Sequence, residues 1–308
     1  MNGHVKSSRR KFLQASAATA LAAAAPWAFA QARDPIVRRI PGSSEEIPVI
    51  GMGSWGTFDI GNKQRLRRDR VQVLRNFFNN GGTFIDSSPM YGSSEENIGY
   101  CLQEIGTDAV FSATKVWILG QQNGVEQMQH SAGLWGVPRF DLMQIHNFLD
   151  WKNHLRTLRQ WKDEGRVRYI GITTSHGRRA KDMAQVIASE PDIDFIQITY
   201  NIADRDAEKR LLPLAADHGK AVIINRPFRR KQLINDVSRA SLPQWAGEIE
   251  CDNWPQFLLK FIVSHPAVTC AIPATSRADH MIENMGACYG PLPDATMRTK
   301  MVSYFESV

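Results

Sequence analysis

Four side chains with complementary acid–base chemistry occur between residues 86 and 146. Asp86 and Tyr91 are five residues apart, Lys115 follows a threonine, and His146 follows an isoleucine. An ammonium beside a phenol favours the phenolate, and a carboxylate beside that ammonium holds it in place. A neutral imidazole can orient a polar group of a ligand by hydrogen bonding. Brought together, these side chains would form a site at which a tyrosine gives or takes a proton.

Each of these side chains also has a structural interpretation. Asp86 can cap a loop, Lys115 can pair with a surface acid, Tyr91 can pack at the rim of a sheet, and a single histidine such as His146 often belongs to a core. All four, however, lie at or just after the ends of three successive apolar runs. Catalytic groups are commonly held at the carboxyl ends of strands, where loops admit a substrate. Their joint position favours the functional interpretation.

From residue 49 onward, short apolar, β-branched runs alternate with longer amphipathic stretches. This alternation is typical of parallel strands joined by crossover helices. The strand-like runs are eight in number, at residues 49–53, 83–87, 109–114, 142–146, 167–172, 195–200, 221–225 and 268–273. Helix-like segments between them include residues 68–79, 95–105, 152–164, 180–189, 207–218 and 255–264. A doubly wound sheet normally has fewer strands and a reversal of strand order, so the count predicts an α/β protein with a single (β/α)8 TIM barrel.

Two segments depart from this alternation. Residues 37–48 have a Pro-Gly-Ser-Ser turn at their centre and predict an N-terminal β-hairpin that precedes the barrel. Residues 226–253 form a long connection after the seventh strand, of the kind that often carries binding residues.

Residues 51–56 satisfy the G-x-G-x-x-G pattern of a dinucleotide-binding turn. Such a turn opens directly into a helix, whereas residues 57–63 contain Asp59, Gly61 and Asn62 and have no apolar periodicity. We therefore expect these glycines to serve a tight turn of the backbone at the mouth of the first strand.

The first 32 residues differ in composition from the rest of the chain. They carry four positive charges, no acid, an alanine-rich stretch and a small-x-small site at residues 28–30. Residues 8–13, Ser-Arg-Arg-Lys-Phe-Leu, resemble the twin-arginine export signal. We expect residues 1–32 to be a cleaved signal peptide and residues 33–308 to form the barrel, which would reach the periplasm through the twin-arginine translocase. A disordered tail or a membrane anchor is the alternative, but the apolar stretch is short for a bilayer, so no stable membrane span is expected in the mature chain.

Charge and cysteine spacing argue against two further kinds of site. Without the four cations of the first 32 residues the formal net charge falls from +6 to +2, so nucleic acid is not an expected partner. The cysteines are far apart in the chain and form no C-x-x-C pair, which indicates neither a redox dithiol nor a zinc site, and no metal is expected. We interpret them as buried thiols, although an oxidising periplasm would permit a disulfide. They are Cys101, Cys251, Cys270 and Cys288.

The motifs at the strand ends resemble those of the aldo-keto reductase family, and the resemblance spans residues 33–308. The matching elements are Asp-x-x-x-x-Tyr-Gly at 86–92, Thr-Lys at 114–115, Ile-His at 145–146, Gly-Met-Gly at 51–53 with Trp55, and the segments 164–172, 272–275 and 283–284. The resemblance implies reduction of a small aldehyde or ketone to an alcohol by hydride transfer from a nicotinamide cofactor. In that reaction Tyr91 would donate the proton, Lys115 would lower the pKa of Tyr91, and Asp86 would anchor Lys115. His146 would orient the carbonyl.

The resemblance also implies residues that bind the cofactor. Thr173 and Thr174 stand where the family usually has Ser-Asn, and with Gln197 they would hold the nicotinamide carboxamide. Arg226 stands near the place of a stacking aromatic residue, and its guanidinium could stack or bind pyrophosphate. Lysine and arginine are replaced by Ala274 and His280 at the adenosine end, so Arg277 is the remaining candidate for a 2′-phosphate. NADP(H) is the expected cofactor and NAD(H) the alternative. The other predicted contacts are Gly53, Trp55, Thr275, Glu283 and Asn284.

Trp55 and Trp117 are expected to line an apolar substrate pocket above Tyr91, with rim packing as the alternative. Asn147 follows the histidine where many relatives have an aromatic residue, which predicts a more polar pocket there. A second hypothesis is a barrel that binds nucleotide as a sensor or partner subunit without turnover. A third, a sugar isomerase on a TIM barrel, would need clustered acids or metal ligands at strand ends, and that pattern is absent from the sequence.

Overall fold

A computed structural model describes residues 33–106 and 109–308, so the predicted signal peptide at residues 1–32 lies outside the described residues. Eight parallel strands are hydrogen-bonded in the order β10-β9-β8-β7-β6-β5-β4-β3. The two edges of this sheet meet, because Ile50 pairs with Ala271 and the amide of Gly53 donates to Pro273 O at 3.0 Å. The predicted (β/α)8 barrel is confirmed. Its strands are β3 (Met52–Gly53), β4 (Phe84–Asp86), β5 (Phe111–Val116), β6 (Phe140–Ile145), β7 (Val167–Thr173), β8 (Phe195–Thr199), β9 (Ala221–Asn225) and β10 (Cys270–Ala271).

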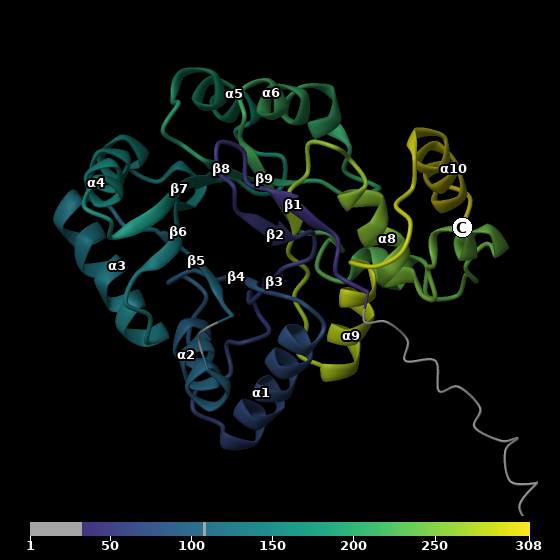
Figure 1. Ribbon diagram of the computed structural model, residues 1–308, viewed down its shortest axis with the longest axis horizontal. Coiled ribbons are helices and arrows are strands. Elements are labelled where there is room, and N and C mark those ends of the chain that lie inside the picture. Colours follow the sequence, from purple (N-terminus) through teal and green to yellow (C-terminus); the bar gives the residue numbers. More distant parts are fainter. Residues whose placement is uncertain (1–32, 107–108) are drawn as a thin grey trace, which may run out of the picture. The chain divides into compact units, whose positions relative to one another are not determined.

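Helices surround the strands (Figure 1), and several of them bury one face. In α1, for example, Val73, Leu74 and Phe77 are fully buried at helical spacing while Arg68 and Asp69 face solvent. The helices are α1 (Gln64–Asn79), α2 (Ser94–Ile105), α3 (Gln121–Trp135), α4 (Trp151–Asp163), α5 (Ala180–Ser189), α6 (Leu211–Asp217), α7 (Gln232–Asp236), α8 (Trp254–Val263), α9 (Ala278–Gly286) and α10 (Ala295–Phe305), with short 3-10 turns η1 (His146–Phe148), η2 (Asp206–Lys209) and η3 (Gln244–Ile249). Within residues 33–106 and 109–308, no helix has the length and apolar character needed to cross a membrane.

One predicted helix is divided. Residues 207–218 form η2 and α6, separated at Arg210, whose φ is −148°. Pro213 explains the break, because a proline fits the first turn of a helix but not its interior, so the α-helix begins only at Leu211. The long connection at residues 226–253 contains α7 and η3.

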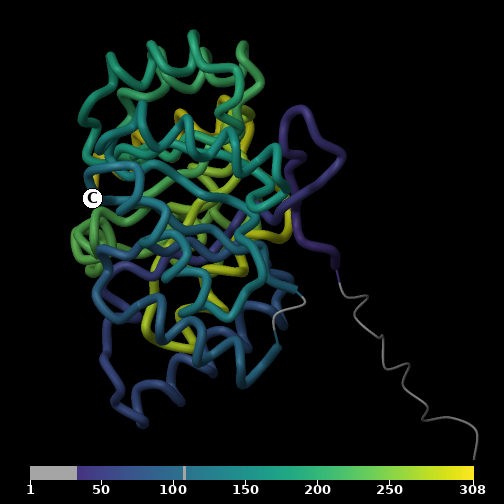
Figure 2. Tube along the Cα trace, turned by 90° about the vertical axis from the view of Figure 1, so that its left-hand side faces the viewer, coloured from purple at the N-terminus to yellow at the C-terminus, as the bar shows by residue number. Residues whose placement is uncertain are grey.

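The predicted N-terminal hairpin is present and closes one end of the barrel. Its strands β1 (Val37–Arg39) and β2 (Glu46–Pro48) are antiparallel, with Arg38 opposite Ile47. Ile40 and Ile47 belong to one buried cluster with Phe84, Phe111 and Phe195, which are the first residues of their strands. Figure 2 shows this hairpin in purple at one end of the barrel. The carboxyl ends of the strands are therefore left at the opposite end, where loops can form a site.

The glycines of the G-x-G-x-x-G pattern serve close packing more than a turn, which corrects the sequence interpretation. A side chain on Gly51 would meet Phe84 O at 2.8 Å, and one on Gly53 would meet Ile272 O at 2.9 Å. Both glycines therefore let β3 lie close to its two neighbours in the sheet. Only Gly56, with φ of +69°, has the left-handed backbone of a turn.

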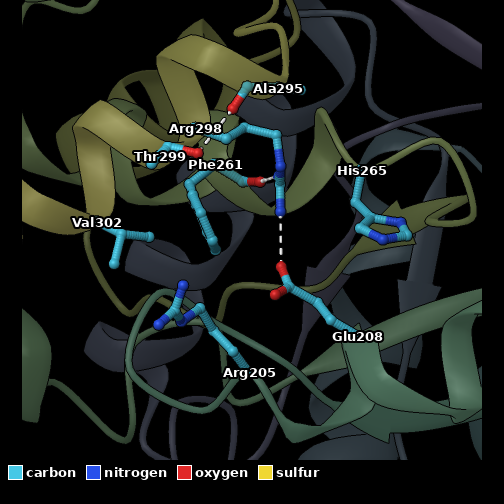
Figure 3. A pocket seen from close by; sticks show the side chains of 8 residues that line it. All are labelled: Arg205, Glu208, Phe261, His265, Ala295, Arg298, Thr299 and Val302. Carbon is cyan, nitrogen blue, oxygen red and sulfur yellow. Dashed lines mark hydrogen bonds and ion pairs between the residues drawn. The ribbon is translucent and has the colours of Figure 1, made fainter.

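Arg298 joins the last helix, α10, to three other parts of the chain. Figure 3 shows Arg298 of α10 pointing toward Glu208, beside Phe261 and His265. Its Nη2 donates to Glu208 Oε1 at 2.8 Å and to the hydroxyl of Tyr200 at 2.5 Å, and its Nη1 donates to Ser264 Oγ at 2.8 Å. Arg298 and Glu208 line the hollow of about 330 Å³ beside α10 and are paired with each other, and Arg205 and Thr299 there are bonded to Glu306 and to Ala295 O, so we assign this hollow a structural role.

Candidate active site

Lys115 and Asp86 form a buried ion pair at the carboxyl ends of neighbouring strands β5 and β4. Lys115 Nζ donates to Asp86 Oδ2 at 2.5 Å and to Ser87 O at 2.7 Å, and the lysine is 0% exposed. Burial by itself lowers the pKa of Lys115, but the charge of Asp86 and the hydrogen bonds of the ammonium raise this pKa above its usual value. Lys115 is therefore a fixed ammonium at neutral pH.

The second oxygen of the Asp86 carboxylate is held by two glutamines. Asp86 Oδ1 accepts from Gln144 Nε2 at 2.7 Å and from Gln197 Nε2 at 3.0 Å. Gln197 Nε2 also donates to Gln144 Oε1 at 3.1 Å, which links the two amides. We predicted Gln197 as a site residue, but we did not predict Gln144. The available signal was a glutamine inside the apolar run of the fourth strand.

Tyr91 lies next to the ion pair. Lys115 Nζ is 5.2 Å from the centre of the Tyr91 ring, so the charge of the ammonium acts directly on the phenol. Burial raises the pKa of Tyr91 more than the charge and hydrogen bond of Lys115 lower it, so the net pKa is above the usual value of 10.0. We expected the ammonium to lower this pKa. The ammonium does lower this pKa, but the expectation left out the larger cost of burying a phenolate, to which the nearby Asp86 carboxylate adds.

His146 lies on the other side of Tyr91. The two rings are 5.9 Å apart in an edge-on arrangement, and the Trp117 ring is 6.5 Å from the imidazole. Burial and the Lys115 charge lower the pKa of His146 to about 2, so the ring is neutral, as expected from the sequence. Ser88 Oγ lies 2.9 Å from His146 Nδ1, a contact that we did not predict. Ser88 carries no distinguishing signal in the sequence, because nothing in the spacing of serine and histidine predicts their contact.

The loops that follow β6, β7 and β9 contain unusual backbone conformations. Ten non-glycine residues of the described chain have positive φ, and all ten follow the carboxyl ends of these three strands. They are Asn147, Phe148, Asp150, His176, Arg179, Arg226, Arg229, Arg230, Lys231 and Glu250. A left-handed backbone at a residue with a side chain costs about 1 kcal/mol or more, and such strain gathers at binding sites. The positive-φ backbone of the described residues is therefore gathered in the loops after these three strands.

Three predicted cofactor residues lie beside the ion pair. Thr173 and Thr174 end β7, and Gln197 lies opposite Thr173 on β8. Thr173 Oγ1 accepts from the amide of Asn147 at 3.1 Å and donates to no described group. Gln197 Oε1 receives one long contact, 3.4 Å from Asn225 Nδ2. A buried hydroxyl donor and a buried amide acceptor thus remain available, and this pair fits the carboxamide of a nicotinamide.

The other predicted contacts are distributed around the mouth and along α9. Trp55 is 44% exposed, and the Arg230 guanidinium stacks 4.0 Å above its ring, while Trp117 is 41% exposed. Arg226 is half-buried and makes no ion pair with any described residue. The Arg277 guanidinium is paired with Asp279, to whose Oδ1 its Nε donates at 3.0 Å. Arg277 follows β10, whereas the ion pair is formed by residues of β4 and β5. Thr275 and Asn284 are buried, and Glu283 is half-buried.

The cysteines and the possible metal ligands of the described residues form neither a disulfide nor a metal site. The four cysteines are free and buried, and burial raises the pKa of Cys101, Cys251 and Cys288 to about 12. Among residues 33–106 and 109–308, no three histidine, cysteine or acidic side chains are grouped so that they could hold a metal ion.

Comparison with known proteins places this geometry in context. A family model described as the aldo/keto reductase family matches residues 49–236. The "NADH-specific methylglyoxal reductase" of Escherichia coli (strain K12) is 24% identical over 239 residues, which are 67% of this chain and 72% of that protein. The aldo-keto reductase YhdN of Bacillus subtilis (strain 168) is 28% identical over 196 residues, 56% of each protein. The crystal structure of an aldo/keto reductase from Klebsiella pneumoniae in complex with NADP and acetate has a TM-score of 0.72 and 22% identity, covering 89% of this chain and 96% of its own.

Proposed function

The chain belongs to the aldo/keto reductase family, and we propose that it reduces a small aldehyde or ketone to an alcohol with a reduced nicotinamide cofactor. The observation that carries the proposal is the position of a tyrosine beside a buried ammonium. Lys115 is fully buried and bonded to Asp86 at 2.5 Å, its Nζ is 5.2 Å from the centre of the Tyr91 ring, and Tyr91 stands beside the neutral His146. A structural ion pair at a barrel end needs neither the phenol nor the imidazole.

Tyr91 is the proposed proton donor. Its raised pKa keeps the phenol protonated at neutral pH, so a proton is available for the carbonyl oxygen. The phenolate left behind is stabilised by the Lys115 ammonium, which Asp86 and Ser87 O hold in position. In the reverse direction the same phenolate accepts the proton of the alcohol. The hydride comes from the nicotinamide when it is bound.

His146 is proposed to hold the carbonyl oxygen with its Nε2 proton. Ser88 Oγ accepts a contact of 3.4 Å from the amide of Met90, so its own proton is free to point at His146 Nδ1. An imidazole that accepts at Nδ1 carries its proton on Nε2. Ser88 is therefore a positioning residue that sets which nitrogen of His146 donates.

Thr173, Thr174 and Gln197 are the proposed residues for the carboxamide, and Gly53, Arg226, Thr275, Glu283 and Asn284 for the rest of the cofactor. We propose NADP(H) in preference to NAD(H), in keeping with the Klebsiella complex with NADP, although one relative is named as NADH-specific. Arg277 is already paired with Asp279, so its share in a 2′-phosphate site requires that this pair opens. Titration of the protein with NADPH and NADH, followed by quenching of tryptophan fluorescence, separates the two cofactors.

The decisive test compares the protein with its Tyr91→Phe variant. A panel of small aldehydes and ketones that includes methylglyoxal is assayed by NADPH and NADH oxidation. We expect turnover by the natural chain and a loss of about 10³-fold in kcat for the variant, with cofactor affinity unchanged, because only the proton donor is removed. Tight cofactor binding without turnover of any carbonyl by the natural chain would instead favour the nucleotide-binding sensor.

We also propose that residues 1–32 direct export of the folded barrel by the twin-arginine translocase. The support is the Ser-Arg-Arg-Lys-Phe-Leu segment followed by an alanine-rich stretch. Because such a substrate folds before export, we propose that it carries its cofactor out of the cytoplasm. The full chain should be found shortened in the periplasmic fraction with nucleotide detectable by mass spectrometry. A variant with Arg9→Lys and Arg10→Lys should stay in the cytoplasm, and equal export of both chains would contradict the proposal.

A further inference from the structure

A second hollow at the carboxyl ends of the strands extends from two of the proposed cofactor residues, Thr174 and Arg226, to residues that the proposed reaction does not use. It has a volume of about 800 Å³ and is lined from the loops that follow β7, β8 and β9. We call it the basic groove, and its lining residues lie within 174–181, 198–211 and 226–232. Its inner end reaches Thr174 at the end of the strands, and its outer end reaches the first turn of α5 and the turn η2.

The lining of the basic groove is unbalanced in charge. Seven of the lining residues are lysine or arginine, and three are acidic. Each of the three acids already has a partner: Asp204 accepts from Arg229 Nε at 2.7 Å, Asp206 from Lys209 at 2.7 Å, and Glu208 from Arg298 at 2.8 Å. No acid in the groove is therefore left to neutralise a further cation.

Four of the groove's cations make no ion pair with any described residue. They are Arg178, Lys181, Arg210 and Arg226. Arg226 is half-buried and the other three are exposed; like charges that line one hollow repel one another, and that repulsion is relieved when an anion enters. The pKa of His176 responds to this field, because burial and then the charges of Arg226, Arg178 and Arg230 all lower it. The groove thus concentrates positive potential at a place that a ligand can reach.

Two features favour phosphate over a single carboxylate. A phosphate monoester carries about two negative charges near neutral pH and presents three acceptor oxygens, which matches several separate cations. Arginine holds such oxygens with paired hydrogen bonds. The backbone at the start of α5 adds donors of the same kind, because no side chain caps this helix and its residues Ala180 and Lys181 line the groove.

We propose that the basic groove binds the phosphate group of a small phosphorylated molecule. The hollow is of the size that accommodates a small metabolite. The phosphate has two possible sources, the carbonyl substrate itself or a separate phosphorylated effector, since the groove ends at Thr174 next to the proposed nicotinamide position. Binding by the groove depends on its cations and requires no turnover, so it can be tested independently of the proposed reduction.

Calorimetric titration of the full chain with inorganic phosphate, in the presence and absence of NADP⁺, tests the proposal. The groove variant is Lys181→Gln with Arg210→Gln. The control is Arg65→Gln with Arg68→Gln, which removes two exposed cations of α1 that make no ion pair with a described residue. We expect the natural chain and the control to bind phosphate equally, with NADP⁺ present or absent. The groove variant should bind at least about tenfold more weakly, because one charge-assisted hydrogen bond contributes a factor of this size.

Three results would overturn the proposal: no binding of phosphate, equal weakening in the control, or loss of binding whenever NADP⁺ is present, which would assign the cations to the cofactor.

The source of the phosphate follows from kinetics with glyceraldehyde and glyceraldehyde 3-phosphate. If the substrate carries the phosphate, KM for the phosphorylated aldehyde rises in the groove variant while that for glyceraldehyde does not, and inorganic phosphate competes with the phosphorylated aldehyde. If an effector carries it, both aldehydes keep their KM ratio while phosphate binding is still lost in the groove variant.

Discussion

Replacement of Lys115 by methionine removes the ammonium at the centre of the site while keeping the length of the side chain. Lys115 is 0% exposed, its Nζ contacts Asp86 Oδ2 at 2.5 Å and Ser87 O at 2.7 Å, and it lies 5.2 Å from the centre of the Tyr91 ring. The variant therefore leaves a buried carboxylate without its counter-ion and a carbonyl without its donor. The phenolate that forms when Tyr91 gives up its proton also loses its stabilising charge.

The size of the effect on stability follows from these contacts. Removal of one partner of a buried ion pair costs about 3 to 5 kcal/mol, because the remaining charge stays buried. Asp86 keeps the amide donors of Gln144 and Gln197, so we expect the lower end, about 3 kcal/mol, in the free energy of unfolding. The pKa of Lys115 is raised in the folded state, so its contribution is fully present below the unfolded value of about 10.4 and is lost as the pH rises through the folded pKa. The difference between the two proteins should thus be constant up to about pH 10 and shrink above it.

Urea unfolding followed by fluorescence measures the stability, and single-turnover absorbance of the cofactor measures hydride transfer. We expect the chemical step of Lys115→Met to slow by roughly 10² to 10³-fold. Lys260→Met is the matched control, because Lys260 is also 0% exposed but its Nζ contacts only the carbonyl oxygens of Ile249 and Pro291. This control should lose about 1 to 3 kcal/mol and keep the rate of the chemical step. A Lys115→Met protein that unfolds no more easily than Lys260→Met, or that transfers hydride at the natural rate, would refute the reasoning.

Three further predictions concern single groups. Ser88→Ala should lower kcat about tenfold, because it removes the hydrogen bond that sets which nitrogen of His146 is protonated. Ser88→Thr keeps a hydroxyl and should restore kcat. An unchanged kcat in Ser88→Ala would exclude the positioning role. The pH profile of kcat for reduction should have no inflection between pH 5 and 8, because the pKa of His146 is lowered to about 2. The rate should fall only above about pH 10, because the raised pKa of Tyr91 keeps the proton donor protonated below that pH. An inflection near pH 6.5 that disappears in His146→Gln would contradict this. Arg298→Met should lower the free energy of unfolding by about 2 to 3 kcal/mol and leave kcat unchanged, because Glu208 and Tyr200 lose their hydrogen-bond donor. Urea unfolding measures the first quantity and a rate assay the second. A large fall in kcat would show that α10 acts on the site.

The barrel itself was predictable from local patterns. Strands buried on both sides appear as short apolar runs, and the helices between them have one apolar face, so counting the units was sufficient to distinguish a closed barrel from an open sheet. The Pro-Gly turn of the hairpin was also predictable, because it depends on local backbone geometry. Residues 207–218 were mistaken for one helix because their apolar spacing continues across the break. The break comes from Pro213, which is tolerated only in the first turn of a helix.

The sequence determined which residue types were available at the strand ends, and strand geometry then required Asp86, Lys115 and His146 to point into the same end of the barrel. The tertiary structure alone decided what surrounds them. The amides of Gln144 and Gln197 on Asp86, the hydroxyl of Ser88 on His146, and the raised pKa of Tyr91 depend on distances and burial between strands far apart in the chain. The same holds for the basic groove, whose cations come from three separate loops. Desolvation and cross-strand hydrogen bonds are properties of the packed barrel, and no spacing of residues along one chain encodes their magnitude.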